Sequence, residues 1–313
     1  MITKQLDLWK LSFQDERQMR AVIGLNKPEF EDLLTTFHQL VIEKHSSSKR
    51  QRALGGGRVG KLGGLTVAGS AMKLVFVLIW LRTYPTYDIY SFITKLERSR
   101  CQRWVIYLLP ILESSLGRKL VLPERKVRSI EEFERLFPGV KDIFIDGAER
   151  PIQKPKDQKK KKKLYSGKKK TTTRKVIIAT DQTQRILILG GTKTGRRHDK
   201  RIAEKQGILQ CIPDDVDLWV DTGFQGVQKD RSPGKIHMPS KASKNKPLTE
   251  EQKQNNHVIG SFRVVVEHAI GHMKISRAAS DTWRGKKGGL DDTVNLIAAG
   301  LWNFRLNHKQ GIA

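Results

Sequence analysis

The amino-acid sequence predicts an all-helical N-terminal region followed by a mixed α/β domain. Up to about residue 137, apolar side chains recur at spacings of three and four, which is the period of an α-helix. From about residue 138, short apolar runs bounded by glycine, aspartate and threonine indicate strands. A long amphipathic segment at residues 257–274 follows these runs, and this order is typical of a sheet flanked by helices.

The composition favours a nucleic-acid partner. The chain has 313 residues, enough for about two domains, and 38% of them are hydrophobic. Lys and Arg number 59 against 32 Asp and Glu, so the formal net charge is +27 and the pI is about 10.2. Such a charge attracts polyanions. No stretch is apolar enough to predict a membrane span, and two cysteines are too few for a disulfide framework or a zinc site.

The N-terminal 137 residues divide into three expected parts. Residues 1–45 read as helical, with a helix that begins around Asn26–Glu29 and runs to about Glu43. Residues 46–64 are basic and rich in glycine and serine, which fits either a solvated linker or an arm that follows a DNA backbone. Residues 65–137 then form a helical region of their own.

This helical region is a candidate helix-turn-helix. We expect helices at residues 72–83, 87–96 and 100–109, the last with Ser99 as its N-cap. The third helix opens with Arg100, Gln102 and Arg103 on its polar face, which suits contact with a major groove. An ordinary helical bundle with a charged face is the alternative.

The α/β domain is expected at residues 138–313. The residues 140–146 predict a strand that ends at the turn dipeptide Asp146-Gly147. The following elements are a hairpin of residues 176–180 and 186–189, a helix at 196–207, strands at 218–221 and 236–238, a capping box at 249–252, and a last helix at 294–304.

Three acidic residues stand out in this domain. Asp146 and Asp221 each end a strand, and neighbouring parallel strands bring equivalent ends close together. Glu267 lies on the late helix between Arg263 and Lys274, on one stripe of its surface. Taken alone, this stripe is more simply explained by an exposed ion pair on an amphipathic helix. If the three carboxylates converge, their repulsion calls for divalent cations, and oxygen ligands select a pair of Mg²⁺ ions, or Mn²⁺ in their place.

These motifs in combination resemble the DDE transposases with a ribonuclease H-like core, in the bacterial insertion-sequence branch related to Harbinger-type elements. The matching segments are FIDGAERPI around Asp146, GRRHDK at 195–200, LWVDTGFQG around Asp221, HMPSK at 237–241, Leu248-Thr249, Asn256, RVVVEHAIGHMK from Arg263, and PTYDIYSFITKLERSRCQRW at 85–104. The resemblance extends over roughly residues 20 to 308. One position departs from a related signature, which has Tyr where this chain has Gly260.

The resemblance implies roles for individual residues. Asp146, Asp221 and Glu267 would be the catalytic metal ligands of a ribonuclease H-like mixed sheet flanked by helices. Arg263 and Lys274 would contact DNA phosphates or orient Glu267. The residues His198 and Asp199 would act as second-shell groups or contact DNA, although a simple helix cap is an equal alternative.

A lysine-rich loop is expected at residues 154–175. Its cations include Lys159, Lys160, Lys161, Lys162, Lys163, Lys168, Lys169 and Lys170. Because this segment follows Asp146 in the chain, its cations would lie along DNA that enters the site. Each phosphate that they neutralise would add to the affinity for DNA. A disordered solvated loop that orders on binding is compatible with this role.

The implied function is DNA transposition: nicking at terminal inverted repeats and joining of 3′-hydroxyl ends to target DNA. Double-stranded DNA is then the partner, with at least a homodimer on DNA because two ends must be paired. We expect no membrane association and a cytoplasmic, nucleoid location if the host is bacterial. A catalytically silent DNA-binding descendant is the alternative. An aspartic protease, suggested by Asp221-Thr222-Gly223, and an RNA-binding protein fit less well.

Overall fold

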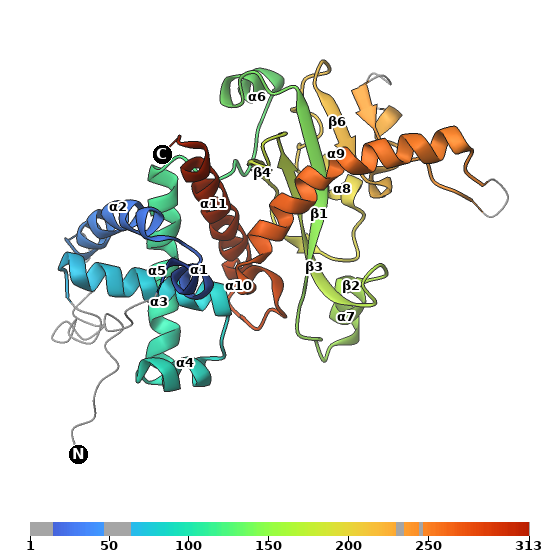
Figure 1. The fold of residues 1–313 in the computed structure, drawn as a ribbon. Helices are drawn as coiled ribbons and strands as arrows, with labels where there is room; N and C mark the ends of the chain where they lie inside the picture. The colour runs from blue at the N-terminus through green and yellow to red at the C-terminus, as the bar shows by residue number, and fades with distance from the viewer. Residues whose placement is uncertain (1–14, 47–63, 230–234, 244–246, 313) are drawn as a thin grey trace. The chain divides into compact units, whose positions relative to one another are not determined.

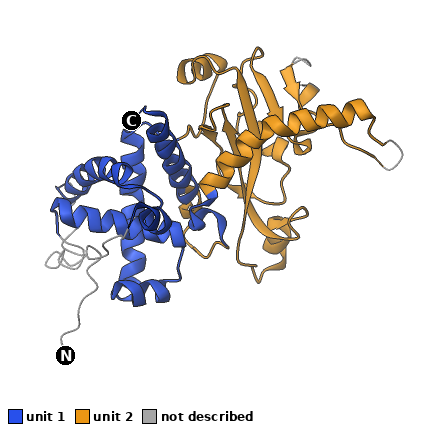
Figure 2. Ribbon diagram, in the orientation of Figure 1, with its two compact units in different colours: residues 1–122, 274–281, 293–313 blue, residues 123–273, 282–292 orange. Residues whose placement is uncertain are grey.

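The computed structural model describes residues 15–46, 64–229, 235–243 and 247–312. The chain forms two compact units (Figure 2). Unit 1 comprises residues 1–122, 274–281 and 293–313, and unit 2 comprises residues 123–273 and 282–292. Each unit is described by itself below.

Unit 1 is helical. Its elements are α1 (Glu16–Ile23), α2 (Lys27–Ser46), α3 (Val67–Thr83), α4 (Tyr87–Thr94), α5 (Arg98–Arg118), α10 (Arg277–Ser280) and most of α11 (Leu290–Gln310). The helix α3 is buried over almost its whole surface, as its continuous apolar sequence predicts. The structure therefore confirms a helical N-terminal region.

Local capping sets several helix ends in unit 1. Asn26 and Glu29 form a reciprocal capping box, with Glu29 N donating to Asn26 Oδ1 at 2.9 Å, so α2 begins where the sequence predicts. The prediction that Ser99 caps the third helix is wrong. The amide of Arg100 already donates to the Glu97 carbonyl at 2.9 Å, which places Ser99 inside the first turn. The helix also continues through Pro110 to Arg118, because the flanking apolar side chains are buried.

Unit 2 is built on a mixed sheet. Its strands are β1 (Asp142–Pro151), β2 (Tyr165–Ser166), β3 (Thr171–Thr180), β4 (Ile186–Leu189), β5 (Lys193–Thr194), β6 (Asp217–Val220) and β7 (Ile236–His237). The strand β1 pairs antiparallel with β3 and parallel with β6, which in turn pairs parallel with β7. The long β3 also pairs antiparallel with β2, β4 and β5. The mixed α/β fold class is confirmed, as is the β3–β4 hairpin.

Alternation along β1 and β6 gives the sheet two different faces. Ile145 and Val220 belong to a core that also includes residues of α6 (Ile130–Leu136) and α8 (Asp199–Lys205). On the other face lies α9 (Glu250–Lys274), which crosses β1 in Figure 1. The ring of Phe262 on α9 stacks on Trp219 of β6 with centroids 4.5 Å apart. The capping box at the start of α9 is also present, with Gln252 N donating to Thr249 Oγ1 at 3.2 Å.

Two expectations about the segment after Asp146 are wrong. The dipeptide Asp146-Gly147 is not a turn, because β1 continues past it and stays paired with β3 as far as Pro151. The lysine run is not an irregular loop either. Residues 158–164 form the short helix α7 (Gln158–Leu164), whose first turn is capped by the Asp157 carboxylate, and β2 follows directly.

The division into units differs from the expected domain boundaries. Residues 123–137 belong with the sheet, because Glu124 accepts an amide bond from Leu189 at 2.9 Å and donates one to Leu187 at 2.8 Å. The C-terminal segments 274–281 and 293–313 belong with the N-terminal helices. Of the expected linker at 46–64, residues 47–63 lie outside the described residues. Among the helices described here, none is long and apolar enough to cross a membrane.

Candidate active site

Asp146 and Asp221 lie next to each other at the sheet. The parallel pairing of β1 with β6 matches Ile145 with Val220, and the two aspartates are the residues that follow this pair. Because side chains alternate along a strand, both aspartates point to the face on which α9 lies, away from the core that contains Ile145 and Val220. The strand order thus brings together two acids that are remote in the sequence.

The chain holds the two carboxylates in the same way. Oδ1 of Asp146 accepts a hydrogen bond of 2.7 Å from the Gly147 amide. Oδ1 of Asp221 accepts one of 2.6 Å from the Thr222 amide, and the Thr222 hydroxyl lies at 3.2 Å. In each case a neighbouring backbone group fixes one carboxylate oxygen, so the second oxygen is left to face other partners.

The second oxygen of each aspartate faces a basic side chain. Arg263 of α9 lies 3.8 Å from Oδ2 of Asp146, and Lys168 of the β2–β3 turn lies 3.8 Å from Oδ2 of Asp221. Both separations are at the outer limit of an ion pair, and neither includes a hydrogen bond. Arg263 and Lys168 therefore place positive charge near the two carboxylates, and neither forms a hydrogen bond with the carboxylate oxygen that it faces.

Burial raises the pKa of Asp146 above its ordinary value. The negative charges of Asp221 and Asp199 raise this pKa further, while the Gly147 amide and Arg263 lower it. A crowded set of carboxylates is costly unless cations neutralise it. Carboxylate oxygens are the ligands that Mg²⁺ and Mn²⁺ prefer, so the donor set at Asp146 and Asp221 fits a divalent cation.

A buried charge network supports the backbone next to both acids. Lys175 of β3 lies between two carboxylates, 3.0 Å from Glu149 Oε1 and 2.7 Å from Asp199 Oδ1. The Lys175 and Glu149 side chains are almost fully buried, and Thr173 also donates to Glu149 at 2.8 Å. Hydrogen bonds from Lys175 and Thr173 lower the pKa of Glu149 in spite of its burial, so this residue stays ionised.

Two glycines allow Asp199 to approach the acids. A Cβ atom on Gly147 would lie 2.9 Å from Asp199 Oδ1, and one on Gly223 would lie 3.2 Å from Asp199 Oδ2. These glycines lie one residue after Asp146 and two residues after Asp221. Asp199 therefore packs against both segments that carry the acids, and any larger residue at Gly147 would push it away.

The structure does not bring Glu267 to the aspartates. This residue lies one turn after Arg263 on α9 and is exposed. Among the described residues, neither Asp146 nor Asp221 shares a hydrogen bond or ion pair with it, and no group of three or more His, Cys, Asp or Glu side chains is arranged to hold a metal ion. Lys274 ends α9 and belongs to unit 1, whereas both acids belong to unit 2.

The other predicted residues are dispersed over both units. His198 is exposed and precedes α8, but its side chain makes no capping hydrogen bond. Gln102 and Arg103 are exposed and Arg100 is half-buried in the first turns of α5. The cations Lys159, Lys160, Lys161, Lys162 and Lys163 lie on α7, and Lys168, Lys169 and Lys170 lie in the β2–β3 turn.

Sequence reasoning missed the contributions of Glu149 and Lys175. The reason is that the sequence predicts the end of this strand at Asp146 and places Lys175 in the lysine-rich segment 154–175. A usable signal was present: when β1 is continued, Glu149 and Lys175 become a directly opposed pair of opposite charge on antiparallel strands.

Two neighbouring carboxylates beside basic side chains, on a mixed sheet, are typical of enzymes that cut phosphodiester bonds with divalent metal ions. Comparison with known proteins makes the class specific. A family model described as "DDE superfamily endonuclease" matches residues 145–303. The chain is also 32% identical over 241 residues to a "Probable transposase for insertion sequence element IS702" of Microchaete diplosiphon, covering 76% of this chain and 81% of the relative. No solved structure gives a significant match.

The chain therefore belongs to the DDE superfamily of endonucleases, as a transposase of the insertion-sequence type. Membership implies dependence on a divalent metal ion and DNA as the partner. The resemblance stated from sequence motifs is thus confirmed at the level of the family.

Proposed function

We propose that this transposase binds the terminal inverted repeats of its own element, nicks the DNA there and joins the freed 3′-hydroxyl ends to target DNA. The observation that carries the proposal is that Asp146, inside β1, and Asp221, directly after β6, both follow the last matched pair of these two parallel strands. Each carboxylate has one oxygen held by a backbone amide and the other facing a cation.

Asp146 and Asp221 would hold the metal ions, with Glu267 as the third ligand. Two Mg²⁺ ions, or Mn²⁺ in their place, would activate a water molecule or a 3′-hydroxyl and stabilise the leaving oxygen. Glu267 is exposed and one helical turn from Arg263, so a change of its side-chain rotamer or a shift of α9 on DNA binding would bring it to the site. Arg263 and Lys168 would then contact DNA phosphates close to the acids.

Asp199 acts through its neighbours in this proposal. Because it packs against Gly147 and Gly223, it would position the two backbone segments that carry the acids. Lys175 would hold the Asp199 carboxylate in place and balance its charge. The role is that of a positioning residue, which refines the expectation of a second-shell group at residues 198 and 199.

The remaining assignments extend the proposal to DNA recognition. The mixed sheet supports a ribonuclease H-like catalytic core, and α3 to α5 would supply a helix-turn-helix that presents Arg100, Gln102 and Arg103 to the element ends. The lysines of α7 and of the β2–β3 turn would contact the DNA backbone close to the site. Joining two ends requires at least a dimer on DNA, which would assemble in the nucleoid of a bacterial host.

The test is a cleavage assay on DNA that carries the inverted repeats bracketing the reading frame. Asp146→Ala, Asp221→Ala and Glu267→Ala should each abolish nicking in Mg²⁺ while the affinity for the ends stays within a few-fold of wild type. Near-normal nicking by one variant would remove that residue from the catalytic set. If the wild-type protein binds the ends but never nicks them, it is a silent descendant instead.

A further inference from the structure

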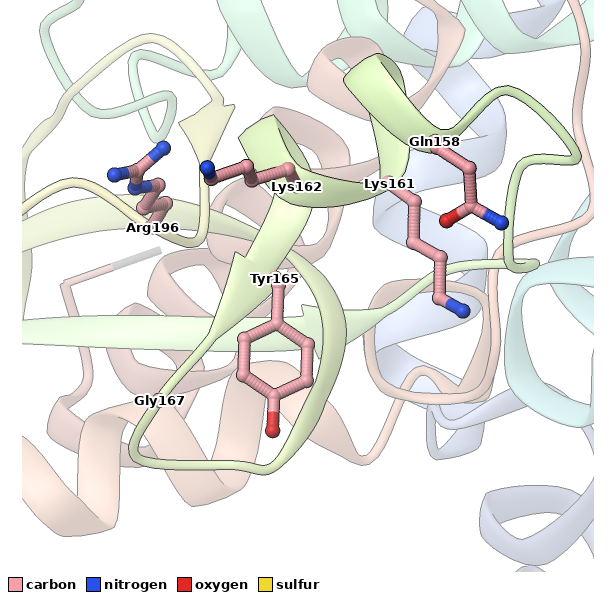
Figure 3. Close-up of a pocket in the computed structure, with 6 residues that line it drawn as sticks. All are labelled: Gln158, Lys161, Lys162, Tyr165, Gly167 and Arg196. Atoms are coloured by element: carbon pink, nitrogen blue, oxygen red, sulfur yellow. The ribbon is translucent and has the colours of Figure 1, made fainter.

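A pocket of about 630 Å³ lies in unit 2 (Figure 3). It is lined by Gln158, Lys161, Lys162, Tyr165, Gly167 and Arg196. These residues come from α7, from β2 and the turn after it, and from the segment that leads into α8. The six lining residues therefore include three cations and an aromatic ring, and no acid.

Two chain segments connect the pocket to the candidate active site. Gly167 of the pocket is followed by Lys168, whose amine lies 3.8 Å from Asp221. On the other side, Arg196 of the pocket is followed by Arg197, whose carbonyl accepts a hydrogen bond of 3.2 Å from Lys175. The pocket and the acids are thus linked by the β2–β3 turn and by the segment before α8.

The side chains of the pocket match the parts of one nucleotide. Tyr165 is 42% exposed, and an exposed aromatic ring is a surface on which a base can stack. In Figure 3 Lys162 extends toward Arg196 on one side of Tyr165, and Lys161 extends on the other side. Cations in this arrangement bind phosphate oxygens. The volume is in the range of sites that enclose a small ligand, about 300–1,000 Å³.

We propose that this pocket binds one unpaired nucleotide of the DNA strand in the active site, with its base on Tyr165 and its phosphate between Lys161, Lys162 and Arg196. A base inside a duplex is covered on both faces by its neighbours, so only an unstacked base can use this ring. If the pocket bound only the phosphate backbone of DNA, the exposed Tyr165 ring and the concave shape of the pocket would have no function. The inference rests on the proposed DNA cleavage and specifies the form of the substrate.

The test measures equilibrium binding in EDTA, so that no cleavage occurs. The probes are a blunt duplex of the element end, the same duplex with three unpaired nucleotides at the cleavage site, and the second probe with an abasic site at each unpaired position in turn. Wild-type protein should bind the unpaired probe more tightly than the blunt one, because the unstacking cost is already met. An abasic site at one of the three unpaired positions should remove this gain in affinity. The expected gain is about fivefold or more, which corresponds to the stacking of one base.

Variants separate the pocket from general electrostatics. Tyr165→Ala should lose the preference for the unpaired probe and Tyr165→Phe should retain it, because the phenylalanine ring can still stack. Lys162→Ala should reduce the preference as well. Lys159→Ala is the matched control: it lies on the same helix outside the pocket, so it should weaken binding of all probes equally and leave their ratio unchanged.

The inference is overturned if Tyr165→Ala keeps the wild-type ratio, or if no abasic position matters in the wild-type protein. The second result needs no variant, so it is decisive even if Tyr165→Ala folds poorly. Specific binding and nicking of the blunt end, without any preference for unpaired DNA, would leave the proposed function intact and reject the pocket. Failure to bind either probe would reject the proposed function itself.

Discussion

Substitution of Gly147 by alanine tests the packing on which the site depends. The new Cβ atom would lie 2.9 Å from Oδ1 and 3.0 Å from Cγ of Asp199, so the carboxylate must move by about 0.5 Å to reach ordinary contact. It cannot move freely, because Lys175 holds it at 2.7 Å and Gly223 lies on its other side. Overpacking of this kind costs about 1–3 kcal/mol, and we expect about 2 kcal/mol in the free energy of unfolding.

The measurement is urea denaturation of Gly147→Ala, Asp199→Ala and the double variant. Because Asp199→Ala removes the atoms with which the new methyl group collides, the double variant should be more stable than the sum of the single effects by at least about 1 kcal/mol. Additivity within about 0.5 kcal/mol would refute the proposed collision. Gly271→Ala is the matched control, since a Cβ atom there meets nothing within 4 Å.

The same substitution should also slow DNA nicking. The Gly147 amide donates the 2.7 Å hydrogen bond that orients Asp146, so displacement of this backbone misplaces a proposed metal ligand. We expect the nicking rate of Gly147→Ala to fall at least tenfold at saturating DNA while the affinity for the ends changes little. An unchanged rate in a folded variant would show that Asp199 and Gly147 do not position the site.

Three further predictions concern stability, each measured by urea denaturation. Gly271→Ala lies in the exposed interior of α9 and should stabilise the protein by about 0.5–1 kcal/mol; a loss of stability would contradict the open space seen there. Lys175→Met should cost about 3–5 kcal/mol, because it leaves Glu149 and Asp199 as uncompensated buried charges; a cost below 1 kcal/mol would contradict the network. Burial lowers the pKa of Lys73 to about 8, so the unfolded state binds more protons between pH 8 and about 10.4 and the free energy of unfolding should rise with pH in this window. Between pH 7.5 and 10 the free energy of unfolding of Lys73→Met should rise by about 2 kcal/mol less than that of the wild-type protein. The same pH dependence in both proteins would refute the lowered pKa of Lys73.

The pairing of the two aspartates could be predicted from the sequence because it depends on regular features. Short apolar runs that end in Asp146 and Asp221 indicate strands, and parallel neighbours align their ends. The turn expected at Asp146-Gly147 was wrong because a local dipeptide preference was weaker than the continued pairing of β1 with β3. Pairing with another strand is a tertiary effect that a short sequence window does not contain.

Contacts between side chains of distant segments could not be predicted from the sequence for a similar reason. The packing of Asp199 against Gly147 and Gly223 joins three segments, and it depends on backbone positions that only the assembled sheet defines. Helical periodicity predicts that Arg263 and Glu267 lie on one stripe of α9, but it does not determine which turn of that stripe lies over the acids. In the structure Arg263 lies 3.8 Å from Asp146, and Glu267, one turn further along the helix, is exposed.

Binding of Mn²⁺ to the complex with element-end DNA tests the central claim most directly. Electron paramagnetic resonance reports the loss of the free-ion signal, and it can be compared between wild type, Asp146→Asn and Asp221→Asn. Asp215→Asn serves as the control, because Asp215 is an exposed acid in a loop of the same unit. We expect both active-site variants to lose the bound ions and the control to keep them. If Asp146→Asn and Asp221→Asn both bind Mn²⁺ as the wild-type protein does, the assignment of a metal centre to Asp146 of β1 and Asp221 after β6 is contradicted.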